Sequence, residues 1–149
     1  GGLLLAPEPQ VLATLGYYEL HVVGVEKRRA DALKRVCAHA TRLEGSATRP
    51  GPERRAHLES VPGIGPWTSA EVARVVAGDA DAVSVGDFHL KHVITHALGG
   101  EPRGTDEGML DLLEPFAGHR GRVCVLIESA GISPPRYGPR QPIQSLSRR

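Results

Sequence analysis

The stretch SVPGIGPWTSAE, residues 60–71, places two glycines and two prolines between two segments with helical periodicity. Glycine permits tight or left-handed backbone geometry. Pro66 suits the first turn of the second helix, because an amide N–H at that position would have no partner inside the helix. The stretch therefore predicts two helices joined by a tight turn, a hairpin that we place at residues 56–77. Trp67, the single tryptophan of the chain, directly follows the turn.

The turn also predicts a cluster of backbone N–H groups that no side chain covers, at the positive end of the second helix. Such a cluster binds phosphate without needing a basic side chain. A nearly neutral protein could grip DNA in this way, and the net charge of this chain is only +1. An ordinary helix–helix turn is the alternative interpretation of the same residues.

Composition places the chain among globular proteins and excludes several kinds of metal centre. Its 149 residues, 40% of them hydrophobic and 23% charged, suffice for one domain or part of one. Cys37 and Cys124 lie at apolar positions of helix-like segments, so we expect buried thiols, and two cysteines cannot complete a four-cysteine zinc or iron–sulfur site. The opening GGLLLA is too short to span a membrane and lacks the pattern of a signal peptide, which predicts an intracellular, cytoplasmic protein.

Apolar residues recur at spacings of three and four along most of the chain, and no good run of strict alternation occurs. This pattern predicts an all-α protein. We expect helices within residues 9–20, 27–44, 90–98, 109–116 and 123–130, and a flexible connector at 45–52. Residues 1–132 then form a helical domain. Residues 133–149 form a proline-rich tail with four arginines and no acidic residue, which either lies along a polyanion or is a solvated terminus.

A second informative stretch is V83-S-V-G-D-F-H-L-K91, in which Gly86 and Asp87 interrupt an apolar run just before a predicted helix. Asp87 fits the N-cap of that helix, a role that aspartate fills often. We expect Phe88 to lie in the core. His89, His92 and His96 nearly share one helix face, for which a solvated or phosphate-facing surface is favoured over the alternative of a metal site. We therefore predict no bound metal.

The segments L58-E-S-V-P-G-I-G-P-W-T-S-A70 and V83-S-V-G-D-F-H-L-K91 together resemble the helix-hairpin-helix, Gly/Pro-rich loop and aspartate (HhH-GPD) superfamily of base-excision DNA glycosylases. The most similar branch is 3-methyladenine DNA glycosylase II, whose members carry PGIG-x-W-T-A and an aspartate at the same distance. The resemblance extends loosely from Pro9 to Tyr137, and its specific motifs cover roughly thirty residues. It implies an all-α helix-hairpin-helix glycosylase domain, of which this chain is the C-terminal portion because the family's complete domain begins upstream of residue 1.

The resemblance also implies roles for individual residues. Asp87 supplies the carboxylate that stabilises the oxocarbenium-like transition state of N-glycosidic bond cleavage. Trp67 forms a wall of the pocket for the flipped base, and a core tryptophan that braces the hairpin is the alternative. No cofactor is required, although the hairpin carbonyls can hold a monovalent cation as in relatives. The backbone contacts to DNA phosphate are assigned to Gly63, Ile64, Gly65 and Thr68.

Relatives that also nick the DNA backbone carry a lysine at the position of Trp67, and its amine forms a Schiff base with the sugar. The resemblance therefore implies a monofunctional DNA glycosylase that uses water to release alkylated purines in base-excision repair. Its partner is double-stranded DNA with a flipped damaged base, bound by a monomeric, nucleoid-associated bacterial protein. Glu71 stands where some relatives place an aromatic residue, which implies a different base preference.

Two alternatives remain open: a noncatalytic helix-hairpin-helix DNA-binding module, and a glycosylase fragment that is inactive without its upstream helices. Asp87 distinguishes the enzyme from the module, because a domain that only binds DNA phosphates does not need a carboxylate near the DNA backbone. Five basic residues either contact the DNA backbone or form a polar helix face, namely Lys27, Arg28, Arg29, Lys34 and Arg35.

Overall fold

The computed structural model describes residues 2, 4–45 and 47–135, and all regular secondary structure in these ranges is helical. The prediction of an all-α fold is therefore confirmed. None of the described helices has the length and apolar character needed to cross a bilayer. Most of the predicted Pro/Arg-rich tail, residues 136–149, lies outside the described residues. The helices are α1 (Pro9–Thr14), α2 (Tyr17–His21), α3 (Lys27–Ala38), α4 (Ala40–Glu44), α5 (Gly51–Glu59), α6 (Pro66–Ala77), α7 (Leu90–Gly99), α8 (Asp106–Leu113), the 3-10 helix η1 (Glu114–Phe116) and α9 (Arg120–Ser129).

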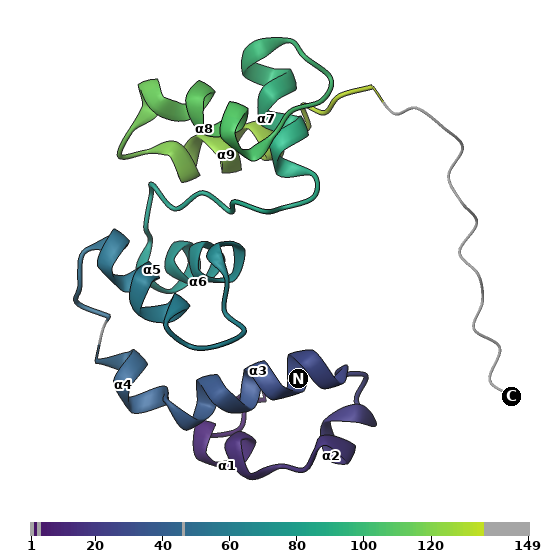
Figure 1. Ribbon diagram of the computed structural model, residues 1–149, viewed down its shortest axis with the longest axis vertical. Helices are drawn as coiled ribbons and strands as arrows, with labels where there is room; N and C mark the ends of the chain where they lie inside the picture. The colour runs from purple at the N-terminus through teal and green to yellow at the C-terminus, as the bar shows by residue number, and fades with distance from the viewer. Residues whose placement is uncertain (1, 3, 46, 136–149) are drawn as a thin grey trace, which may run out of the picture.

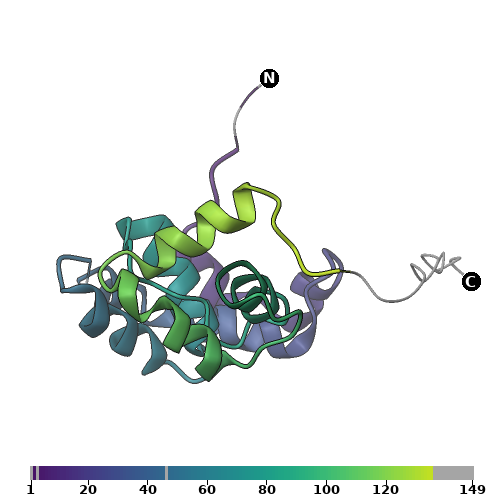
Figure 2. The same cartoon turned by 90° about the horizontal axis from the view of Figure 1, so that it is seen from above.

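The helices form three layers that follow one another along the chain (Figure 1). Helices α1 to α4 occupy one end of the molecule, α5 and α6 the middle, and α7 to α9 the other end. Figure 2, turned to look from above, shows that the layers lie over one another. The layer of α7 to α9 lies at the top of Figure 1 and is called the upper layer. Residues 78–89, between α6 and α7, connect the middle layer to the upper layer and are called the crossing segment. Asp87 therefore lies where these two layers meet.

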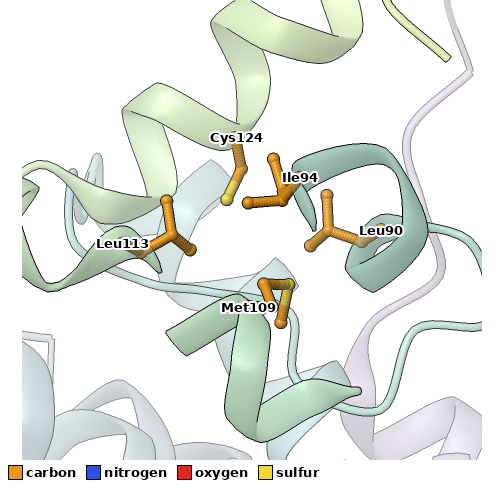
Figure 3. Packing of buried hydrophobic residues seen from close by; sticks show 5 residues of the cluster. All are labelled: Leu90, Ile94, Met109, Leu113 and Cys124. Carbon is orange, nitrogen blue, oxygen red and sulfur yellow. The ribbon is translucent and has the colours of Figure 1, made fainter. Parts of the chain in front are cut away.

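The main core lies in the upper layer, where five buried side chains converge from three helices (Figure 3). Ile94, Met109 and Leu113 have no exposed surface. Because Leu90 is both the first residue of α7 and a member of this core, the packing fixes the backbone that follows Asp87. The five residues are Leu90 and Ile94 of α7, Met109 and Leu113 of α8, and Cys124 of α9.

A second, smaller cluster joins the crossing segment to the middle layer. It consists of Ala70 and Ala73 of α6 and Ala82 of the crossing segment, all almost fully buried. Small side chains allow the backbone of the crossing segment to approach α6 closely. The segment that carries Asp87 is thus packed on α6 at one end and tied to the core through α7 at the other.

Several of the expected helix boundaries differ from the structure, and α8 and α9 begin three residues earlier than expected, at Asp106 and Arg120. The segment predicted as one helix at 9–20 is divided at Gly16, which precedes α2 in an extended conformation while its N–H donates to the Glu19 carboxylate over 2.7 Å. The segment at 27–44 is interrupted at His39, where the backbone leaves helical geometry. Helix α5 begins at Gly51, inside the predicted connector, because Pro52 suits the first turn of a helix. The hairpin therefore starts earlier than the predicted 56–77.

The side chain of Asp81, in the crossing segment, anchors the start of α9. Its Oδ1 accepts hydrogen bonds from the backbone N–H groups of Gly118 (2.9 Å) and Arg120 (3.0 Å) and from Arg120 Nε (2.8 Å). The Arg120 guanidinium also pairs with Asp81 Oδ2. Hydrogen bonds from the Arg120 side chain lower the pKa of Asp81 to about 2 against the opposing effect of burial, with further lowering by the two backbone N–H groups. This connection holds α9 against the segment that carries Asp87.

Asp81→Asn is expected to destabilise the protein at neutral pH and to lose that effect in acid. Because the folded pKa is about 2 and the pKa of an unfolded aspartate about 3.9, the ionised carboxylate contributes on the order of 2 kcal/mol above pH 4. That contribution disappears as the pH falls from about 4 to about 2. Urea unfolding of wild type and Asp81→Asn across this pH range measures the difference in unfolding free energy between the two proteins. A difference that stays constant with pH would contradict the prediction.

Candidate active site

The turn between α5 and α6, residues 60–65, has the geometry that its glycines suggest. Gly63 has a φ of +101°, in the region that disfavours residues with a Cβ. A Cβ built on Gly63 would lie 3.2 Å from Ala32 Cβ and 3.8 Å from Arg35 Nη2. The turn therefore lies close to α3, and the Arg35 guanidinium is positioned beside its glycine.

Several backbone N–H groups of this turn and of the first turn of α6 have no acceptor in the part of the chain that the structure describes. They belong to Gly63, Gly65 and Thr68, three of the four residues assigned to phosphate contacts. The fourth, Ile64, donates its N–H to Val61 O over 3.0 Å, so this amide closes the turn. Three amides near the positive end of α6, together with Arg35, form a suitable anion site. Phosphate binding itself stays a prediction.

The carboxylate of Asp87 makes contacts in two directions. Its Oδ1 accepts hydrogen bonds from the backbone N–H groups of His89 (2.7 Å) and Leu90 (2.8 Å) at the start of α7. Its Oδ2 accepts a hydrogen bond from the indole Nε1 of Trp67 over 3.1 Å. One oxygen thus fills the N-cap role, while the other faces the tryptophan that follows the hairpin turn. The two interpretations considered for Asp87 are therefore compatible.

The surroundings of Asp87 favour its ionised form. Burial by itself raises the pKa of this carboxyl, but the backbone N–H groups of Leu90 and His89 and the indole of Trp67 donate hydrogen bonds to the carboxylate. With a smaller effect of the nearby His89 charge, the pKa of Asp87 falls below its usual value. A fixed negative charge suits the stabilisation of a developing cation better than the donation of a proton.

Trp67 is 46% exposed, so it is not a core residue. It does connect the two functional segments, because its Nε1 holds Asp87 while its backbone belongs to the first turn of α6. Phe88 is 74% exposed, and the expectation that it lies in the core is wrong. Its ring packs edge-on against His89 and His92 on the surface of α7, beside a groove of about 680 Å³.

A small pocket of about 40 Å³ opens beside Asp87, between α6, the crossing segment, the start of α7 and α9. An ordered water needs about 10–15 Å³ by the same measure, so the pocket has room for water but not for a nucleobase in this conformation. Its polar side chains include Glu71, whose position the sequence had linked to base preference, and Arg74 of α6 and Glu128 of α9, which the sequence did not assign to the site. The polar residues are Glu71, Arg74, Ser84, Asp87 and Glu128.

Other residues considered from the sequence do not join this site. Lys91 pairs with Asp106 of α8 over 3.4 Å. His92 Nδ1 accepts the backbone N–H of Gly104 over 3.1 Å, and no group of side chains suited to a metal ion occurs among the described residues. In the basic run, Lys27 and Arg29 form local ion pairs with Asp31 and Glu26. Both cysteines are buried and free, as expected.

Comparison with known proteins bears on this arrangement of hairpin, aspartate and pocket. The chain matches no protein-family model and no curated protein. It does resemble a solved DNA-3-methyladenine glycosidase from Bacillus halodurans, with a TM-score of 0.69 and 21% sequence identity. The two proteins share a fold. The match covers 84% of this chain and 59% of the glycosidase chain, so the present chain spans less than two thirds of the length of its structural neighbour.

Proposed function

We propose that the chain is the C-terminal portion of a monofunctional DNA glycosylase that hydrolyses the N-glycosidic bond of alkylated purines in duplex DNA. The observation that carries the proposal is the position of Asp87. Its carboxylate is held by the indole of Trp67 over 3.1 Å, directly after the hairpin turn, and lines a pocket. The fold shared with a DNA-3-methyladenine glycosidase supports the same reaction class.

The reaction breaks the bond between C1′ of deoxyribose and the base nitrogen, and the electron pair leaves with the base. Positive charge develops on the sugar, as in glycoside hydrolysis. An anion at about 4 Å stabilises such a charge by about 4 kcal/mol at an effective dielectric of 20, against about 1 kcal/mol in water. Water then attacks C1′, and its proton passes to Asp87 or to solvent. Asp87 acts here as a fixed charge that faces the sugar.

Trp67 decides which products form. The position after the turn carries no amine, so no Schiff base with the sugar can form there. We therefore assign the products as free base and an abasic site in an intact strand. The half-exposed indole also offers an electron-rich face to a cationic alkylated base. The free amides of the turn would hold a phosphate of the same strand.

Base release by this chain tests the proposal directly. A duplex with a single 7-methylguanine is incubated with the protein, and free 7-methylguanine and strand integrity are measured. Release of the base without strand cleavage supports the proposal. Strand cleavage with a borohydride-trapped protein–DNA adduct would show a Schiff base and contradict the monofunctional mechanism. Undamaged duplex of the same sequence is the control.

The second candidate is a noncatalytic DNA-binding module or a glycosylase fragment without activity of its own. The pocket of about 40 Å³ favours it, because a purine does not fit there in this conformation. The limited match, 59% of the structural neighbour's chain, also favours it. Salt-dependent binding to duplex DNA, with no base released from any alkylated purine, would support this candidate over the enzyme.

Trp67→Phe is expected to move the acidic limb of the pH–rate profile to higher pH. The indole N–H favours the ionised form of Asp87, so its loss raises the pKa of that carboxyl, and the active form then persists over a narrower pH range. The plateau rate should fall less than about tenfold, because the phenyl ring keeps an aromatic wall. An acidic limb that does not move would show that this hydrogen bond is absent in the working enzyme.

A further inference from the structure

We infer that Glu128 is a specificity-determining residue, which faces the flipped base and selects cationic, amino-bearing purines over neutral keto purines. This inference rests on the proposed function and deepens it. Glu128 lies on α9, far in sequence from both the hairpin and Asp87, yet it lines the same pocket as Asp87. The pocket combines apolar walls, from Leu90 and Val125, with carboxyl groups. A whole purine does not fit in this pocket of about 40 Å³, so the two carboxyl groups can meet only the edge of a flipped base, where exocyclic amino groups present hydrogen-bond donors.

The polar groups from α6 and the crossing segment already satisfy one another. Glu71 Oε1 accepts a hydrogen bond from Ser84 Oγ over 2.5 Å, and Glu71 Oε2 accepts one from Arg74 Nη2 over 2.6 Å. The positive charge of Arg74, the only arginine or lysine lining the pocket among the described residues, is therefore matched by Glu71. Asp87 and Glu128 remain as carboxyl groups whose charge no cationic side chain pairs.

The side-chain carboxyl of Glu128 has neither a hydrogen bond nor an ion pair to any described residue, and the neighbouring charges are what act on it. Glu128 as a whole is exposed, and the partial burial of its carboxyl raises the pKa of that group. The negative charges of Asp87 and Glu71 raise it further, while Arg74 acts in the opposite direction. From its own helix, the Cys124 thiol also faces Glu128, whose charge adds to the effect of burial in raising the pKa of Cys124 to about 11. The charged form of Glu128 is thus disfavoured by its neighbours. A positive charge entering the pocket would relieve this repulsion.

The chemistry of a carboxylate defines the base that it can recognise. Ionised carboxylates only accept hydrogen bonds, so they pair with exocyclic amino groups and repel keto oxygens. An N-alkylated adenine or guanine carries both an amino group and a positive charge. Hypoxanthine carries neither, since it lacks both the C6 amino group of adenine and the C2 amino group of guanine, and its ring is neutral. A site with Glu128 should therefore release 7-methylguanine faster, relative to hypoxanthine, than the same site without this carboxylate.

The test compares single-turnover release from two duplexes that differ only in the target base, 7-methylguanine or hypoxanthine. Glu128→Gln keeps the size of the side chain and removes its charge. We expect the ratio of the two rates to fall about fivefold or more in this variant. The control is Glu107→Gln, the same substitution at an exposed position of α8 that does not line the pocket, and its ratio should match wild type. Thermal unfolding of each variant checks that the fold is retained.

The pH dependence of the same ratio in the wild-type protein gives a second readout. Titration of Asp87 affects both substrates alike and cancels, whereas protonation of Glu128 should lower the preference for the cationic base as the pH falls. In Glu128→Gln the ratio should not change with pH. A ratio that is the same in wild type and Glu128→Gln overturns the inference and leaves the glycosylase function standing. If wild type releases neither base, the proposed function fails, and the inference fails with it.

Discussion

Asp87→Asn is expected to slow base release at least about a hundredfold, which corresponds to about 2.7 kcal/mol of transition-state stabilisation. The amide keeps the shape of the side chain and removes the negative charge next to the developing oxocarbenium ion. Its oxygen can still accept the N–H groups of His89 and Leu90, because asparagine and aspartate are equally good N-caps. The loss of activity should therefore occur with little loss of stability.

Single-turnover release of 7-methylguanine measures the rate, and thermal unfolding and DNA affinity are measured beside it. Asp111→Asn is the matched control, because Asp111 is exposed on α8 and does not line the pocket. We expect wild-type release from Asp111→Asn and wild-type affinity for undamaged duplex from Asp87→Asn. Equal release by wild type and Asp87→Asn would remove the basis of the proposed reaction, since no other carboxylate of the described residues contacts the indole that follows the hairpin turn.

The helical class and the position of the hairpin could be predicted from the sequence because both depend on local rules. Spacings of three and four marked the helices, and Gly63 has the positive φ that its place in the turn suggested. Helix boundaries were less predictable. Gly16 and His39 interrupt segments whose apolar spacing continues across the break. Periodicity reports which face is buried and does not report where the chain bends.

Some residues of the candidate site could likewise be predicted from the sequence, and others could not. Asp87 and Trp67 belong to two motifs at a known spacing, and the structure places them in hydrogen-bond contact. Glu128 could not be assigned, because only the packing of α9 against the crossing segment brings it to the pocket. Phe88 was misplaced because an apolar residue at the start of a helix is usually buried, whereas here the side chain lies on the surface.

Gly121→Ala is expected to be the most destabilising small substitution in the upper layer. A Cβ at this position would lie 2.2 Å from the carbonyl oxygen of Ala82 and 2.9 Å from its carbonyl carbon. These are backbone atoms, so no side-chain rotation relieves the overlap. Alanine favours a helix by about 1 kcal/mol over glycine, but separating α9 from the crossing segment costs more, including the hydrogen bond from Arg122 N to Ala80 O at 2.8 Å.

We expect a net loss of about 2 kcal/mol, which lowers Tm by about 4–8 °C for a chain of this size. Gly108→Ala on α8 provides the contrast, because its Cβ would lie 3.5 Å from Thr105 Oγ1, an ordinary contact, and the variant should gain up to about 1 kcal/mol. Thermal unfolding of both proteins measures the difference in sign. The contact at Gly121 joins α9, which carries Glu128, to the crossing segment, which carries Asp87. Equal stability of the two variants would mean that these two segments are not packed as described. The pocket between them would then not be formed.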